Sequence, residues 1–204
     1  MPYLLLNSGQ IKSKMDGQML DHRRWSKAVL NDLFCRNIPV ITENDAAPFV
    51  EINSKIAFKQ SAKCMQCHAT LDNMAGVLRN VELFHTSDNN DMSTLRGVFV
   101  NAVNANSKDY YEQKPEGQIL YRNYKNEFIN AKVNSLDEFG QWVSTQDDFY
   151  ICAAKRYTSF LTGENPDYLK DFVIEQGLQF KKHQSLSLLI ENIINSPFYL
   201  NRKL

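Results

Sequence analysis

The chain has 204 residues, of which 43% are hydrophobic and 11% aromatic, and this composition is enough for one globular domain with a substantial core. Its 23 basic and 23 acidic side chains cancel, so no net field favours a nucleic acid or an anionic membrane as partner. No apolar run reaches the about 20 residues that a transmembrane helix needs, and we expect no membrane-spanning segment.

The first elements expected along the chain are helical. Residues 1–20 are polar and weakly patterned, and they are predicted to form an N-terminal arm. Asp21 can cap a helix that runs to about Cys35 and that carries apolar residues at helical spacing. These apolar residues are Trp25, Val29, Leu30, Leu33 and Phe34. Two prolines favour a loop over 38–48, and a short helix is expected over about 50–60.

The sequence CMQCH at residues 64–68 is the most informative stretch, because C-x-x-C-H is the attachment sequence of a c-type haem. Two thiols one helical turn apart can add to the two vinyl groups of one porphyrin, and the adjacent histidine can ligate the iron as proximal ligand. The motif therefore predicts one covalent haem c held by Cys64, Cys67 and His68. His68 is expected to open a helix through about Met74, whose side chain we assign to core packing.

Three other interpretations of this motif are open. A structural zinc site needs four nitrogen or sulfur ligands, whereas the remaining cysteines, Cys35 and Cys152, are isolated in the sequence. A thioredoxin-like dithiol would need a βαβ context, which the flanking sequence does not show. The third is coincidence, although the chain has only four cysteines and four histidines.

The sequence offers several candidates for the sixth iron ligand. Met92 is placed first, because it follows a turn-forming cluster at 87–91 and could fold across the distal face. A methionine there would raise the reduction potential, and a histidine would lower it relative to methionine. The other candidates, besides a vacant site, are His85, Met19, Met15 and His22.

The middle of the chain is predicted to contain a small β insert. Residues 95–103 are apolar and β-branched and suit either a strand or a helix. After a polar loop over 104–117, residues 118–133 are expected to form a hairpin around a turn at 124–127.

The C-terminal part is predicted to be a bundle of helices over about 135–196. The sequence SLDE at 135–138 is a capping box that opens the first helix. Asp147 can cap the second helix, and Gly163 is its expected stop. Its predicted apolar face consists of Phe149, Ile151, Cys152, Tyr157 and Phe160.

Two further helices complete the predicted bundle. Pro166 begins one that runs to about Phe180. The other covers about 184–195, and Pro197 is expected to end it. Together the elements predict a mainly α fold, a cytochrome-c-like helical domain with a small β-hairpin insert and a C-terminal helical bundle. We expect residues 21–204 to form this single domain, with the haem segment over about 50–104.

The two cysteines outside the motif, Cys35 and Cys152, are predicted to form a disulfide, because leftover cysteines commonly pair in an oxidising compartment. Two buried free thiols are the alternative.

Haem attachment to C-x-x-C-H also takes place outside the cytoplasm, so a periplasmic or otherwise extracytoplasmic protein is expected. The opening sequence MPYLLL is too short for a secretory signal and lacks a basic n-region. The chain is therefore expected to be a fragment of a longer exported protein, or one whose signal has been removed.

Four blocks resemble, in order, the C-terminal portion of large exported bacterial proteins of unknown function that bear a c-type cytochrome domain. The blocks are 25–39 (WSKAVLNDLFCRNIP), 64–76 (CMQCHATLDNMAG), 149–163 (FYICAAKRYTSFLTG) and 189–198 (LIENIINSPF). Asn73 and Met74 stand near the place of a proline in the family's second block. The resemblance covers the chain from about residue 20 onward and implies a haem-bearing domain that other domains normally precede. It also carries Cys35 and Cys152 together, but it supplies no substrate.

The sequence thus predicts a monohaem c-type cytochrome domain that transfers electrons outside the cytoplasm, with a redox partner protein that it does not identify. One alternative is a haem-dependent redox or small-ligand-binding module of a larger enzyme. Another is a structural or binding protein of the cell envelope in which haem is a folding staple. No nucleophile elbow, phosphate-binding loop or paired-carboxylate pattern stands out, so an electron-transfer protein is favoured over an enzyme.

Overall fold

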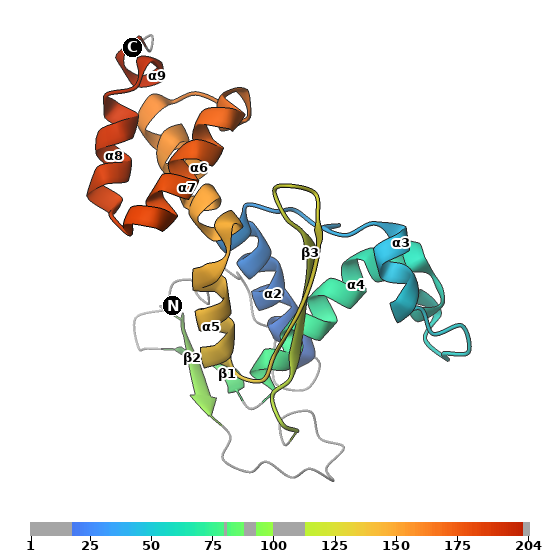
Figure 1. Ribbon diagram of the computed structural model, residues 1–204. Helices are drawn as coiled ribbons and strands as arrows, with labels where there is room; N and C mark the ends of the chain where they lie inside the picture. The colour runs from blue at the N-terminus through green and yellow to red at the C-terminus, as the bar shows by residue number, and fades with distance from the viewer. Residues whose placement is uncertain (1–17, 80, 88–92, 100–112, 202–204) are drawn as a thin grey trace. The chain divides into compact units, whose positions relative to one another are not determined.

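The structure is a computed structural model that describes residues 18–79, 81–87, 93–99 and 113–201, with the backbone alone at 18–21, 81–87 and 93–99. The chain is mainly helical with two separate two-stranded antiparallel sheets, so the mainly α fold with a small β insert is confirmed (Figure 1). It divides into two compact units, which are described separately. The first consists of Met1–Asp32 and Arg36–Trp142, and the second of Leu33–Cys35 and Val143–Leu204. The single domain expected over 21–204 stays a prediction, and most of the expected arm over 1–20 lies outside the described residues.

Helix α2 (Gln18–Phe34) opens the described chain and starts three residues before the expected cap at Asp21. Its apolar stripe is buried as the spacing predicts, because one face of the helix turns toward the core. The buried residues are Trp25, Val29, Leu30 and Phe34. Trp25 meets Phe139 edge to face, with ring centroids 5.2 Å apart.

The loop expected over 38–48 contains helix α3 (Glu43–Ala46), so that expectation was wrong. The reason is a capping box: the Thr42 hydroxyl accepts from the Asp45 amide, and the Asp45 carboxylate accepts from the Thr42 amide at 2.8 Å. The helix expected over 50–60 is reduced to a 3₁₀ turn, η2 (Ala57–Gln60), which follows another, η1 (Ala47–Phe49).

Helix α4 (Ala62–Ala75) carries the C-x-x-C-H motif, and a 3₁₀ turn, η3 (Gly76–Leu78), follows it. His68 lies in the middle of α4, so the expectation that His68 opens this helix was wrong. Met74 is fully buried, and its assignment to core packing is confirmed.

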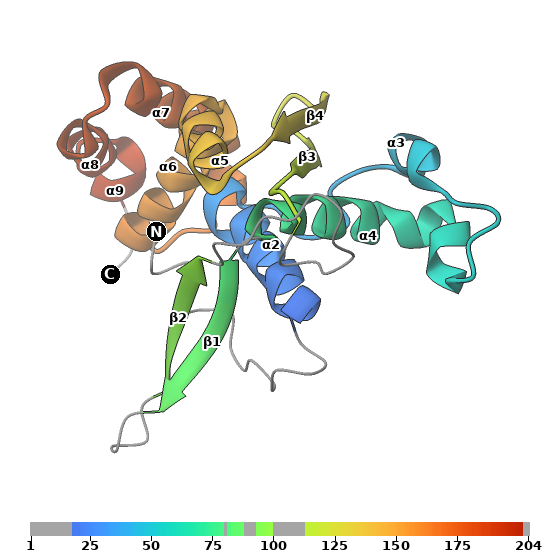
Figure 2. The same cartoon turned by 90° about the horizontal axis from the view of Figure 1, so that it is seen from below.

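Two β-hairpins follow α4 along the chain, and Figure 2 shows them as separate ribbons. Strands β1 (Val81–Ser87) and β2 (Ser93–Phe99) pair antiparallel. The ambiguous segment 95–103 is therefore a strand as far as residue 99. Strands β3 (Gly117–Arg122) and β4 (Phe128–Val133) form the hairpin that the sequence predicts over 118–133.

The end of α4 and the start of β3 meet backbone to backbone. The Glu116 amide donates to the Gly76 carbonyl oxygen at 3.1 Å. A Cβ at Gly76 would lie 2.1 Å from the Glu116 oxygen, and one at Gly117 would lie 2.1 Å from Cγ2 of Val77. Both positions need glycine because there is no room for a side chain at this contact.

The second unit contains the expected C-terminal helices. Its elements are the end of α5 (Leu136–Thr145), α6 (Asp147–Thr162), the 3₁₀ turn η5 (Pro166–Leu169), α7 (Lys170–His183), α8 (Leu186–Ile194) and α9 (Pro197–Leu200). Its buried core cluster consists of Ala154, Val173, Leu189 and Ile193. Gly163 ends α6 with φ 72°, as a left-handed C-cap requires, and this prediction is confirmed.

Several local expectations for these helices were wrong. Asp147 is the first residue of α6 rather than its cap, and Gln146 holds the cap position without a side-chain bond. By contrast, α8 (Leu186–Ile194) ends three residues before Pro197 as expected, and Pro197 also opens α9, because proline fits the first turn of a helix. Phe160 is 85% exposed, whereas Ala154 and Thr158 lie on the buried face of α6.

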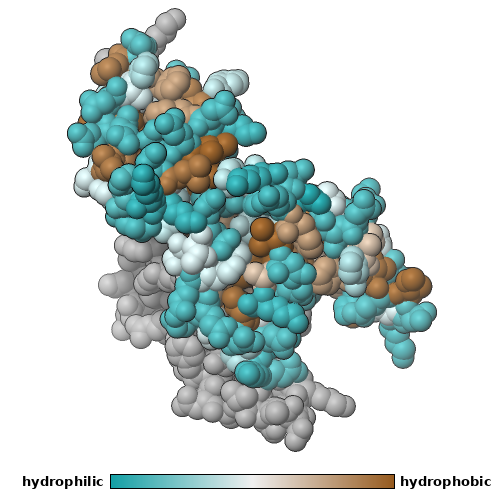
Figure 3. Space-filling model, viewed as in Figure 1, coloured by the Kyte–Doolittle hydropathy of each residue, from teal (hydrophilic) through white to brown (hydrophobic). Residues whose placement is uncertain are grey.

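Apolar residues are exposed at the surface of both units (Figure 3), and Ile52 is one of them in the first unit.

Candidate functional site

Helix α4 divides into a buried face and a partly exposed face. The buried face consists of Met65, Ala69, Thr70, Met74 and Ala75. Gln66 fixes the helix further, because its amide nitrogen donates to the Ile41 carbonyl oxygen at 3.0 Å. Residues three and four apart lie on the same side of a helix, so Cys64, Cys67 and His68 share the partly exposed face.

Neither thiol of the motif is bonded to another sulfur. Cys64 is exposed and Cys67 is half-buried. Burial raises the pKa of the Cys67 thiol, and the negative charge that Cys64 carries as a thiolate raises this pKa further. The two sulfurs are therefore inequivalent: Cys64 is the more accessible, and Cys67 has a raised pKa.

His68 is held between an aromatic ring and a carboxylate. Its imidazole stacks on the half-buried Phe58, with ring centroids 3.9 Å apart and an interplanar angle of 16°. Nδ1 is buried and lies 3.5 Å from Oδ2 of Asp72, which follows His68 by one helical turn. The side chain as a whole is 33% exposed, so its exposure comes from atoms other than Nδ1.

Asp72 is itself anchored by Arg23 of α2. The Arg23 guanidinium donates from Nε to Oδ1 and from Nη2 to Oδ2, the latter at 2.9 Å. Asp72 is 19% exposed and Arg23 is 26% exposed, so water screens the pair less than it would on an open surface. The same Oδ2 thus faces both Arg23 and the buried nitrogen of His68.

The residues present suit the attachment of a c-type haem. Two unbonded thiols separated by one helical turn and an imidazole share one face, which is the donor set that a covalent porphyrin needs. Nδ1 is buried and faces Asp72 at 3.5 Å, which leaves Nε2 as the nitrogen for a metal. Among the described residues, no three His, Cys, Asp or Glu side chains converge to hold a metal ion directly.

The sixth-ligand candidates lie in different parts of the chain. Met92 and Met15 lie outside the described residues. Met19 belongs to α2 and His85 to β1, opposite Leu95, but only their backbone is described. His22 is fully buried in α2. Each of these positions stays a prediction.

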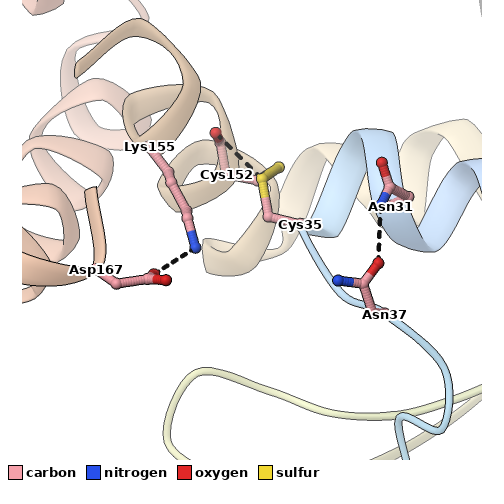
Figure 4. The surroundings of a disulfide bond; sticks show 6 residues. All are labelled: Asn31, Cys35, Asn37, Cys152, Lys155 and Asp167. Carbon is pink, nitrogen blue, oxygen red and sulfur yellow. Dashed lines mark hydrogen bonds and ion pairs between the residues drawn. A yellow bond between two sulfur atoms is a disulfide. The ribbon is translucent and has the colours of Figure 1, made fainter. Parts of the chain in front are cut away.

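Cys35 and Cys152 are bonded in the structure, as the sequence pairs them (Figure 4). Their Cα atoms are 5.2 Å apart across 117 positions of sequence, a separation that a disulfide spans without backbone movement. Cys35 directly follows α2 with φ 51°, and Cys152 is buried in α6. One turn further along α6, Lys155 contacts Asp167 at 2.7 Å.

Sequence reasoning missed three residues of this site. Asp72 had a usable signal, because it follows His68 by four positions in a segment expected to be helical. Arg23 had none, since it lies 49 positions from its partner. Phe58 was placed in an expected helix, and its stacking on His68 has no sequence signature.

Comparison of the chain with protein-family models, with curated proteins and with solved structures finds no match. Among the helices that the structure describes, none has the length and apolarity to cross a membrane.

Proposed function

We propose that this chain is a monohaem c-type cytochrome domain with a cytochrome-c-like helical core, which transfers electrons outside the cytoplasm. The observation that carries the proposal is the arrangement on α4. Cys64, Cys67 and His68 share one partly exposed face with both thiols unbonded, while the other two cysteines of the chain are bonded to each other.

Each residue has a distinct task in this proposal. Cys64 and Cys67 each form a thioether bond that fixes the porphyrin at the surface of α4. His68 presents Nε2 as the proximal ligand, with its ring plane set by Phe58. When bound, the haem supplies an iron that cycles between Fe(II) and Fe(III).

The disulfide supports the proposed location. Disulfides persist in oxidising compartments, and Cys35–Cys152 is such a bond. The resemblance to large exported bacterial proteins points the same way, and it implies that other domains normally precede this one.

The decisive experiment is the maturation of haem on the chain. The chain is exported in cells that express a c-type maturation system, denatured, and tested for haem that stays on the polypeptide. We expect covalent haem on the wild type and none on Cys64→Ala/Cys67→Ala. The matched control is Cys35→Ala/Cys152→Ala, which also removes two cysteines and should still carry haem. Wild type without covalent haem, in cells that mature another c-type cytochrome, would refute the proposal.

The visible spectrum then separates electron transfer from the alternatives. A low-spin spectrum with reversible one-electron reduction supports electron transfer. A high-spin spectrum that shifts on addition of carbon monoxide supports a small-ligand-binding or redox module of a larger enzyme. Haem that cannot be reduced by mild donors supports a structural role in the cell envelope.

A further inference from the structure

We infer that Asp72, anchored by Arg23, is the positioning residue for His68. Asp72 accepts the Nδ1 proton of His68, and it thereby selects the ring tautomer that leaves the Nε2 lone pair free for iron. The part of this inference that concerns iron rests on the proposed function, whereas the tautomer of His68 is a property of the protein without haem.

The first support is the environment of Nδ1. This nitrogen is buried and makes no hydrogen bond within the usual limits, yet Oδ2 of Asp72 lies 3.5 Å away on the same helix. A buried polar atom without a partner is costly, so a small movement that closes the Nδ1–Oδ2 distance is favoured. Because His68 and Asp72 are four positions apart on α4, a side-chain rotation is enough to close it.

The second support is the rigidity of the acceptor. Two hydrogen bonds from Arg23 fix both carboxylate oxygens of Asp72, in the geometry that a planar guanidinium favours. Asp72 therefore cannot turn toward solvent without breaking both. Histidines that bind metals generally donate their other ring N–H to such an acceptor, which fixes ring orientation and increases ligand basicity.

The third support is the stacking of His68 on Phe58. The 16° angle between the rings fixes the plane of the imidazole. Within that plane, Asp72 determines the orientation of the ring, because the Asp72 carboxylate lies beside Nδ1 of His68. The stacked ring and the carboxylate together leave Nε2 as the free ring nitrogen of His68, a residue on the same helix face as Cys64 and Cys67.

The structure offers a matched control for Asp72. Asp45 pairs with Arg122 through two hydrogen bonds of 2.7 and 2.8 Å across 77 positions, also in the first unit. In the described part of the chain, the Asp45 carboxylate accepts hydrogen bonds from Thr42 and Arg122. Asp72→Asn and Asp45→Asn therefore each remove a carboxylate that is paired with an arginine. Asp45 also belongs to the capping box of α3, whereas Asp72 has the neighbouring histidine.

The test in the haem-free protein is the tautomer of the four histidines, read from ¹⁵N chemical shifts and assigned with His68→Gln. We expect His68 to carry its proton on Nδ1 in the wild type and in Asp45→Asn, and to shift toward the Nε2–H form in Asp72→Asn. An Nε2–H tautomer in the wild type would overturn the inference. That measurement needs only the wild type and the assignment variant His68→Gln, so it decides even if Asp72→Asn fails to fold.

The test in the haem-loaded protein is the reduction potential. Loss of the carboxylate makes His68 a weaker donor, so Asp72→Asn is expected to raise the potential, while Asp45→Asn leaves it unchanged. A tenfold loss of preference for ferric iron corresponds to about 59 mV for a one-electron couple. Equal potentials in wild type and Asp72→Asn would overturn the inference. If the wild type takes up no haem, the proposed function fails, and the tautomer measurement alone decides the role of Asp72.

Discussion

Helix α4 carries two cysteines that lie unbonded on its partly exposed face, whereas helix α6 carries one buried cysteine that is bonded to Cys35. Ion pairs lie around both helices: Arg23 reaches Asp72 on α4, and Lys155 of α6 reaches Asp167. The cysteines differ in burial, because Cys64 is exposed whereas Cys152 is buried in α6, whose residue Ala154 belongs to the core cluster of the second unit.

The two pairs of cysteines also differ in their separation along the sequence. Cys64 and Cys67 are three positions apart, so the helix itself places them on the same side. Cys35 and Cys152 are 117 positions apart and meet only because the fold brings them together. Spacing therefore predicts the first pair. The second pair is predicted only because two cysteines are left over in an oxidising compartment, and the fold then brings them together.

Among these predictions, removal of the disulfide should change the free energy of unfolding the most. Cys35→Ser/Cys152→Ser is expected to lower the free energy of unfolding by about 2–5 kcal/mol, because the bond closes a long loop of the unfolded chain. The haem-free control Cys64→Ser/Cys67→Ser should change it by less than about 0.5 kcal/mol, since its thiols are unbonded and not fully buried. Urea unfolding followed by circular dichroism measures both, and equal losses would contradict the distinction between the pairs.

A crowded contact next to Cys152 gives the second prediction. A Cβ at Gly177 of α7 would lie 2.5 Å from the Cα of Ile151, a backbone atom of α6 that cannot move aside alone. Gly177→Ala should therefore cost about 1–3 kcal/mol, although alanine favours the helix. Gly163→Ala is the control. A Cβ at Gly163 meets no atom within 4 Å, so this substitution strains the backbone, whose φ is 72°, without creating a steric clash. A thermal unfolding midpoint for Gly177→Ala at or above the wild type would show that the helices separate easily.

The ion pair beside α4 gives the third prediction. Hydrogen bonds from Arg122 lower the pKa of Asp45 from 3.8 to about 2. A carboxyl whose pKa is lower in the folded state stabilises the fold above its unfolded pKa, and this stabilisation disappears as the pH falls from about 4 to about 2. After allowance for solvent screening it is on the order of 1 kcal/mol.

Tryptophan fluorescence can follow this loss, because both tryptophans, Trp25 and Trp142, lie in the first unit. Asp45→Asn should flatten the dependence of the urea midpoint on pH in that window. Asp167→Asn is the control, since the Asp167 carboxyl is 71% exposed and lies in the second unit. An unchanged dependence in Asp45→Asn would mean that other carboxyls cause the acid loss.

The smallest effect concerns the two free thiols. Cys64 should react with iodoacetamide several-fold faster than Cys67 in the haem-free protein, because Cys67 is half-buried and has a raised pKa. Peptide mass spectrometry after partial alkylation gives the ratio. Cys35 and Cys152 should stay unmodified until a reductant is added, and equal rates at all four cysteines would contradict the comparison.

The sequence predicts local structure well where the signal is local. The stripe of α2 around Trp25, the hairpin over 118–133 and the stop at Gly163 follow from periodicity, turn residues and a left-handed cap. The start of α4 could not be found this way, because Ser61 occupies its cap position without a side-chain bond. Conversely, the capping box at Thr42 could have predicted α3 from the sequence, but the two nearby prolines favoured a loop instead.

In the candidate site, too, the local features are predictable from the sequence and the long-range contacts are not. Cys64, Cys67 and His68 are contiguous enough to be recognised as a motif, and α4 does place them on one face. The anchoring of Asp72 by Arg23 joins segments 49 positions apart, and no composition or periodicity links them. What the sequence leaves out is thus the support around the motif rather than the motif itself.

The contact between Gly76 and Glu116 has a consequence for how this protein can change over evolution. This backbone hydrogen bond holds the two ends of the segment between Gly76 and Glu116 together beside α4, and no side-chain group takes part in it. Doubling the length of a closed loop costs only about 0.6 kcal/mol. Insertions and deletions between residues 79 and 116 should therefore accumulate freely, while any lineage that keeps α4 in place must keep glycine at both 76 and 117.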